Sequence, residues 1–231
     1  RLDQMIAAVK GDGVSKVVDA NGEPLVVYHG TNNDFTAFEI GRETENYSAF
    51  GNYKTSRHAM FASPVVAFAE EFLKKAPGQN VMPVFLAVSR PVDMRDGIDG
   101  PTVRAIVDSA NNLTDRDFYY IGPGEEWQIF DGDFGEQVTN AIKQSGNDGA
   151  RMFEKNADGG MREVWVAFRP EQIKSATSNR GAFDPKNPDI TMSRGSGRGI
   201  ALRDLQAVAD RMSRGFKNLP KVHVLESPDA L

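Results

Sequence analysis

The order of the β-rich runs in the second half of the chain most constrains its fold. Residues 150–153 (ARMF) and 164–168 (VWVAF) follow each other with no helical pattern between them. Ahead of them, Val138 and Ile142 indicate a helix that ends near Gly146. A doubly wound α/β fold needs a helix between consecutive strands. The observed order therefore predicts an α+β core without strict βαβ alternation.

Spacing of apolar residues predicts the other elements. Short β-rich runs predict strands over 24–29 and 81–88, and Pro83 places the second of these at a sheet edge or a bulge. The polar stretch 32–59 has no sustained period and predicts a long irregular segment. Helices are predicted from apolar residues at helical spacing over 2–9, over 64–75 with Ser63 as N-cap and Pro64 at N1, and over 103–110.

Composition narrows the chemistry. The chain has no Cys, which excludes thiol nucleophiles, thiolate zinc sites and disulfides. A net charge of −5 gives no electrostatic footprint for obligate binding to a nucleic-acid backbone. No apolar run approaches the ~20 residues that cross a bilayer, so we expect a soluble protein without membrane contact.

The domain organisation is read from length and linkers. With 231 residues and 40% hydrophobic content, one main domain is expected. The SRGSGRG stretch at 193–199 is typical of a flexible linker. We therefore expect a domain over 1–193, with its core at about 22–192. Residues 194–231 would be a linker plus the start of a following module or a docking tail, and the whole chain a piece of something longer.

Common catalytic templates are absent from the sequence. There is no P-loop, H-E-x-x-H, G-x-S-x-G or EF-hand pattern. His29, His58 and His223 are too dispersed to predict a metal site. Residues 195–199 (GSGRG) are superficially similar to a dinucleotide-binding turn, but no strand precedes them and the linker interpretation is favoured.

The informative element is Tyr28-His29-Gly30-Thr31, at the exit of the first predicted strand. A glycine there lets a ligand approach the backbone, whose N–H and C=O can pair with a planar amide. The alternative is that His29 is a satisfied core or edge histidine and Gly30 only a turn residue. The tetrapeptide alone leaves both interpretations open.

Four motifs in order, YHGT, FASP, VWVAFRPEQIKSA and GAFDPKNPDI, give the sequence a specific resemblance. Over about 22–192 it resembles the ADP-ribosyltransferase superfamily, and more narrowly the domains of that type in large phage polyvalent proteins. The resemblance implies a split, two-sheet α+β core with peripheral helices. It also implies that NAD is bound as a substrate between the sheets without a Rossmann motif.

The resemblance also assigns roles in an NAD site that begins at Tyr28. His29 would hydrogen-bond the adenosine ribose, and Gly30 would pair with the nicotinamide carboxamide. Thr31 would support the turn or touch the ribose. Phe61 and Ser63 of FASP are expected in the same site. Phe72 stands where the poly(ADP-ribose) polymerase pattern has a stacking Tyr, and its alternative is a place on the apolar stripe of the core.

The catalytic carboxylate implied by the resemblance is Glu163, at the start of a late strand, together with His29. The superposition on the polymerase pattern places Val164 at that point, so Glu154 or a changed mechanism is the alternative. Lys54, Arg57 and His58 are cations that either meet the NAD diphosphate or are simply solvated. Gln172 is expected to hold the segment after the last core strand, and Trp165 and Phe168 to anchor the core.

The implied activity is transfer of ADP-ribose from NAD to a macromolecular acceptor, protein or nucleic acid, with release of nicotinamide. The alternatives are an NAD glycohydrolase and an inactive NAD-binding or structural module. The resemblance implies an intracellular setting, either in a bacterium or after delivery into one by a phage.

Overall fold

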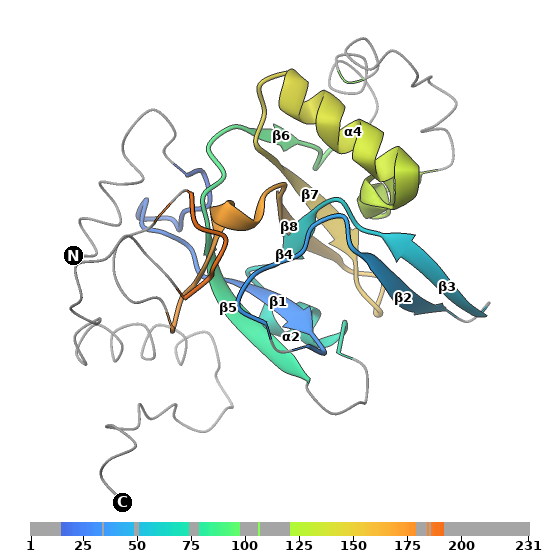
Figure 1. Ribbon diagram of the computed structural model, residues 1–231, viewed down its shortest axis with the longest axis horizontal. Helices are drawn as coiled ribbons and strands as arrows, with labels where there is room; N and C mark the ends of the chain where they lie inside the picture. The colour runs from blue at the N-terminus through green and yellow to red at the C-terminus, as the bar shows by residue number, and fades with distance from the viewer. Residues whose placement is uncertain are drawn as a thin grey trace, which may run out of the picture.

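The computed structural model describes residues 15–33, 35–48, 51–73, 79–97, 106, 121–178, 184 and 186–191. The helix expected over 2–9, most of the helix expected over 103–110 and the tail 194–231 lie outside these residues. The expected α+β class is confirmed: two main sheets carry few helices (Figure 1).

The first sheet has three antiparallel strands in the order β1-β5-β9. The second has four strands in the order β4-β8-β7-β6, in which only β6 and β7 are parallel. Their bounds are β1 Val27–Thr31, β4 Met60–Ala62, β5 Asn80–Leu86, β6 Pro91–Asp93, β7 Gly149–Lys155, β8 Met161–Ala167 and β9 Ile173–Ser175. The predicted strand at 150–153 thus lies within β7, and the predicted strand at 164–168 overlaps β8 from Val164 to Ala167.

Among the described residues, one isolated backbone bridge joins the two sheets. Tyr28 N–H donates to the Ser63 carbonyl at 2.8 Å, and Ser63 N–H donates to the Tyr28 carbonyl at 3.0 Å. This bridge lies just beyond β4 and makes β1 the border between the sheets. After it the two strands separate, and the space between them is where the candidate site lies.

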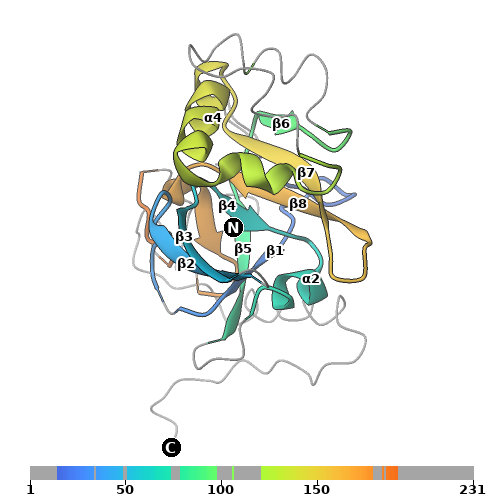
Figure 2. The ribbon, with the colours of Figure 1, turned by 90° about the vertical axis from the view of Figure 1, so that its right-hand side faces the viewer.

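Two apolar clusters form because β8 is buried on both faces. Val164 and Val166 pack with Met152 and with Ile142 of helix α4 (Gly132–Gln144). Trp165 and Ala167, which point the other way, pack with the β1-β5-β9 sheet. Figures 1 and 2 show α4 over the outer face of the second sheet. The helix ends before Gly146, which has φ +88°, as its sequence predicts.

The helix predicted over 64–75 is shorter than expected. Helix α2 covers only Val66–Glu70, and its N-cap is Val65 rather than Ser63. Ser63 is held by the backbone bridge to Tyr28, and its Oγ accepts the Val65 N–H at 3.1 Å. The bridge therefore delays the start of the helix by two residues.

Two further expectations were wrong. The stretch 32–59 contains an antiparallel hairpin of β2 (Glu43–Ser48) and β3 (Gly51–Ser56), which projects away from the sheets (Figure 1). Strand β5 is central in its sheet rather than an edge strand. Its ladder with β9 ends at Val84, however, and Pro83 is tolerated because it lies just past that end, where only its carbonyl is used, by Ala176 N–H at 2.9 Å.

Gln172 joins three parts of the fold, as expected. Its Oε1 accepts the N–H groups of Phe168 and Arg169 at 3.1 and 2.9 Å. Its Nε2 donates to the carbonyls of Ala87 and Asp148 at 2.9 and 2.8 Å. The residue is 3% exposed, so no water can replace these bonds.

We predict that Gln172→Leu lowers the free energy of unfolding by at least about 2 kcal/mol, because each buried polar group left without a partner costs about 1–3 kcal/mol. Urea denaturation measures the loss. The matched control is Gln144→Leu at the exposed end of α4, which should change stability by no more than about 0.5 kcal/mol. Equal losses in the two variants would contradict this account of Gln172.

Candidate functional site

A cavity of about 680 Å³ opens where β1 and β4 separate. Its size is in the range of small-molecule and cofactor sites. The cavity brings together all the residues expected to bind NAD: Tyr28, His29, Gly30, Thr31, Phe61, Ser63 and Phe72. It is also lined by Arg57, Glu154 and Val164, but Glu163 is not among its lining residues.

His29 takes over a hydrogen bond that the diverging strands no longer make. If the antiparallel ladder continued beyond Tyr28 and Ser63, Gly30 and Phe61 would form the next hydrogen-bonded pair. Instead, His29 Nδ1 lies 2.8 Å from the Phe61 carbonyl. A carbonyl only accepts, so Nδ1 carries the proton and Nε2 of the neutral ring is an acceptor.

The surroundings of His29 keep it neutral. Its ring packs edge-on against Phe38, with 5.1 Å between the ring centroids. Burial lowers the pKa of His29, the bond to Phe61 opposes this effect, and the charge of Arg57 adds to it. The site therefore offers a neutral imidazole with one free acceptor at physiological pH.

Gly30 presents its backbone to the cavity. Backbone groups alternate in direction along an antiparallel strand, so those of Gly30 point to the same side as those of Tyr28, away from β5. Tyr28 meets Ser63 on that side, whereas at Gly30 the neighbouring strand has diverged. The N–H and C=O of Gly30 therefore lie on an open strand edge.

The reason for a glycine here differs from the expectation. A Cβ at Gly30 would lie 2.0 Å from the Ala69 carbonyl oxygen of α2. The missing side chain thus lets α2 pack against β1, and the ligand is left with the edge of the strand. Gly30 is also inside β1, so the alternative of a turn residue is wrong.

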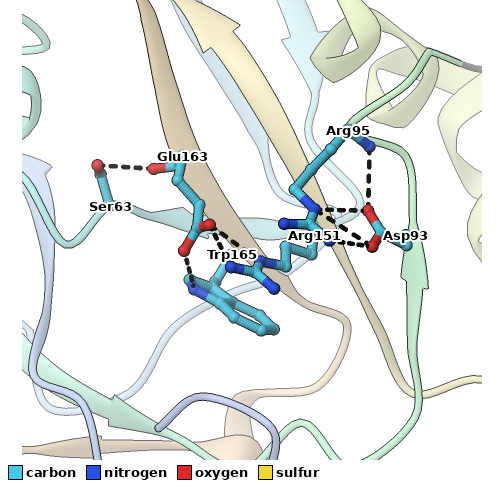
Figure 3. A network of polar contacts seen from close by, with 6 residues as sticks. All are labelled: Ser63, Asp93, Arg95, Arg151, Glu163 and Trp165. Atoms are coloured by element: carbon cyan, nitrogen blue, oxygen red, sulfur yellow. Dashed lines mark hydrogen bonds and ion pairs between the residues drawn. The ribbon is translucent and has the colours of Figure 1, made fainter. Parts of the chain in front are cut away.

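The side chain of Glu163 lies on one face of the second sheet, and that of Val164 lies on the other face. One Glu163 oxygen accepts the Trp165 Nε1–H at 3.0 Å, and the other pairs with the guanidinium of Arg151. Arg151 in turn lies 4.8 Å from the centre of the Trp165 ring. Figure 3 shows the carboxylate turned toward these partners, while the Glu163 carbonyl accepts the Ser63 hydroxyl at 2.8 Å.

Two carboxylates line the cavity: Glu39, which is exposed and paired with Arg42, and Glu154, which is buried. Glu154 lies on β7, on the same sheet face as Val164, because Met152 pairs with Val164 and side chains two residues apart share a face. Glu154 is 8% exposed. Burial raises the pKa of Glu154 to about 7. The positive charge of Arg57 opposes this rise, and the negative charge of Asp131 adds to it.

The aromatic residues of α2 have different places. Phe68 is 3% exposed and belongs to the core, whereas Phe72 is 46% exposed and lines the cavity. The two rings meet edge to face at 5.1 Å. The alternative that Phe72 is a core residue is therefore wrong, and its ring is available to a ligand.

Of Arg57 and His58, only Arg57 lines the cavity, and the side chain of Lys54 lies outside the described residues. The Arg57 guanidinium is bound by Asp131 at 2.8 and 3.1 Å and lies over the rings of Phe61 and Trp127. His58 instead contacts Ser56 Oγ through Nε2 at 3.0 Å. Lys54 is part of β3. Sequence reasoning missed Trp127 and Asp131, which are far from any motif.

The described residues contain neither a cluster of metal-ligating side chains nor a helix that could cross a membrane. No group of three or more His, Asp or Glu side chains is arranged to hold a metal ion among them. Within the same residues, no helix has the length and hydropathy needed to cross a membrane.

Comparison with known families identifies the chain. Residues 19–183 match the model of a family described as ADP-ribosyltransferase in polyvalent proteins. No match was found among curated proteins or solved structures. The matched range is more than half of the chain and contains both strands that border the cavity. The chain therefore belongs to the family of ADP-ribosyltransferase domains found in polyvalent proteins.

Proposed function

We propose that this domain transfers ADP-ribose from NAD to a macromolecular acceptor, a protein or a nucleic acid, and releases nicotinamide. The observation that carries the proposal is the arrangement of one cavity. An open strand edge at Gly30, a neutral His29 and the buried carboxylate of Glu154 all lie on its walls.

The residues fit the two ends of a bent dinucleotide. The N–H and C=O of Gly30 match the two hydrogen-bonding groups of a carboxamide, and the exposed ring of Phe72 offers a face for stacking. His29 Nε2 can accept a ribose hydroxyl because Nδ1 already donates to Phe61. The contacts of Gly30 and Phe72 would hold the nicotinamide end against β1, and the contact of His29 would hold the adenosine ribose.

The chemistry requires negative charge near the breaking bond. When the N-glycosidic bond breaks, its electron pair stays with nicotinamide, which leaves neutral, and positive charge develops on the ribose. A fixed carboxylate stabilises that charge, and the acceptor then forms a new bond to the same ribose carbon. We assign this role to Glu154, because Glu163 is held on the other face of the sheet by Arg151 and Trp165.

Matched variants distinguish the roles of the Glu154 and Glu163 carboxylates. We predict that Glu154→Gln lowers nicotinamide release from NAD by about 100-fold or more, as for other losses of a charge-stabilising group. Glu163→Gln should lower nicotinamide release no more than roughly 5-fold, because the Glu163 carboxylate lies on the face of β8 that does not border the cavity. Release is measured by chromatography on samples with the same circular dichroism. The reverse ranking would return the catalytic role to Glu163.

We predict that His29→Ala weakens NAD binding by roughly 10-fold, about the contribution of one hydrogen bond with its packing. Isothermal titration calorimetry measures the Kd. The matched control is His58→Ala, since His58 contacts Ser56 and does not line the cavity. A wild-type protein that neither binds NAD nor releases nicotinamide would overturn the proposed function.

The raised pKa of Glu154 also predicts that the stability of the protein depends on pH. Its folded-state pKa of about 7 is above the ordinary value of 4.5, so the folded protein holds this proton more tightly than the unfolded chain. Ionisation of Glu154 therefore lowers the free energy of unfolding as the pH rises from about 4.5 to 7, and the full loss is about 3 kcal/mol. Glu154→Gln, which resembles the protonated form, should exceed wild type in unfolding free energy at pH 8 and match it near pH 4. Parallel curves would contradict the raised pKa.

A further inference from the structure

One wall of the cavity is built from residues 35–40, here called the wall segment. Phe35, Ala37 and Phe38 line the cavity from this segment. Phe38 is 8% exposed and meets both Phe35 and His29 edge-on, with centroids 4.7 and 5.1 Å apart. The position of the wall segment therefore decides how His29 is packed.

The wall segment is held by a stretch near the end of the described chain, residues 187–191, here called the clamp segment. Ile190 N–H donates to the Thr36 carbonyl at 2.7 Å, and Asp189 pairs with Ala37. On its other side, the Ile190 carbonyl accepts the Ser175 N–H of β9 at 2.9 Å. The clamp segment thus connects the wall of the cavity to the first sheet.

Lys174 fixes the clamp segment from within the fold. The residue has no exposed surface, and its Nζ donates to the carbonyls of Asn187 and, at 3.0 Å, Asp189. Burial lowers the pKa of Lys174. An ammonium group is costly to bury unless it is hydrogen-bonded, and here its donors bind alternate carbonyls of one segment. An apolar side chain at this position would fill the space without binding the segment.

We propose that Lys174 is a positioning residue for the cavity: it holds the clamp segment so that the wall segment keeps Phe38 against His29. The contacts run without a gap from Lys174 to Asp189, from Ile190 to Thr36 and from Phe38 to His29. This gives a role to two motifs that the cavity lining does not use, IKS at 173–175 and NPDI at 187–190. The effect on NAD rests on the proposed function, whereas the effect on His29 does not.

The test uses Lys174→Met in the full chain, which keeps a long side chain and removes the donors. The first readout is the NMR titration of His29 without NAD. The His29 signal is identified as the one missing from the spectrum of His29→Ala. As Phe38 withdraws, water should reach the ring and the pKa of His29 should rise toward its ordinary value of about 6.5. The second readout is the Kd for NAD, which should rise by roughly 10-fold.

The matched control is Ile142→Ala in α4, which opens a hole in the other apolar cluster and lowers the Tm without touching the clamp segment. It should leave the His29 titration and the Kd unchanged. If Lys174→Met also lowers only the Tm, Lys174 is merely structural and the proposal is overturned. A wild-type protein that does not bind NAD would end the proposed function, while the His29 titration would still decide the role of Lys174.

Asn187→Ala is the second variant if Lys174→Met does not fold. The side-chain oxygen of Asn187 accepts the Asp189 N–H at 3.0 Å and shapes the turn that presents both carbonyls to Lys174. Its removal should shift the His29 titration in the same direction by a smaller amount. An unchanged titration in a folded Asn187→Ala protein would then overturn the proposal.

Discussion

The candidate site depends on an antiparallel ladder that stops after one pair. Tyr28 and Ser63 exchange two backbone hydrogen bonds, and beyond them β1 and β4 diverge. Buried carbonyls need donors, and the His29 ring supplies one to Phe61 where the backbone of Gly30 no longer does. The same interruption leaves the Gly30 edge open. The interruption of this ladder therefore opens the cavity, fixes the tautomer of His29 and exposes the N–H and C=O of Gly30.

Alternation along β7 and β8 decides which carboxylate can act in the cavity. Both faces of β8 are buried, so neighbouring residues belong to different apolar clusters. Glu163 shares a face with Trp165 and is bound by it and by Arg151, whereas Glu154 shares the face of Val164. A shift of one residue along a strand moves a charge to the other side of the sheet. The burial of Glu154 raises its pKa to about 7.

Several elements were predictable because their signals are local. The apolar run of β8, the spacing in α4 with Gly146 after it, and the side-chain hydrogen bonds by which Gln172 holds the segment after β8 all follow from residue patterns. The β2–β3 hairpin was missed because its strands pair only with each other and carry few apolar residues. The length of α2 was overestimated because the bridge at Ser63 overrides a good N-cap signal.

The sequence by itself determined the class of fold, the family motifs and the strand end that borders the cavity, because backbone propensity and spacing act over a few residues. Only the tertiary structure decided that Glu154 lines the cavity and that Glu163 does not, since this depends on strand register. It also decided that α2 rather than a ligand covers the missing side chain of Gly30. Contacts between distant segments, such as Lys174 with Asp189 and Phe38 with His29, exist only once the chain has folded around them.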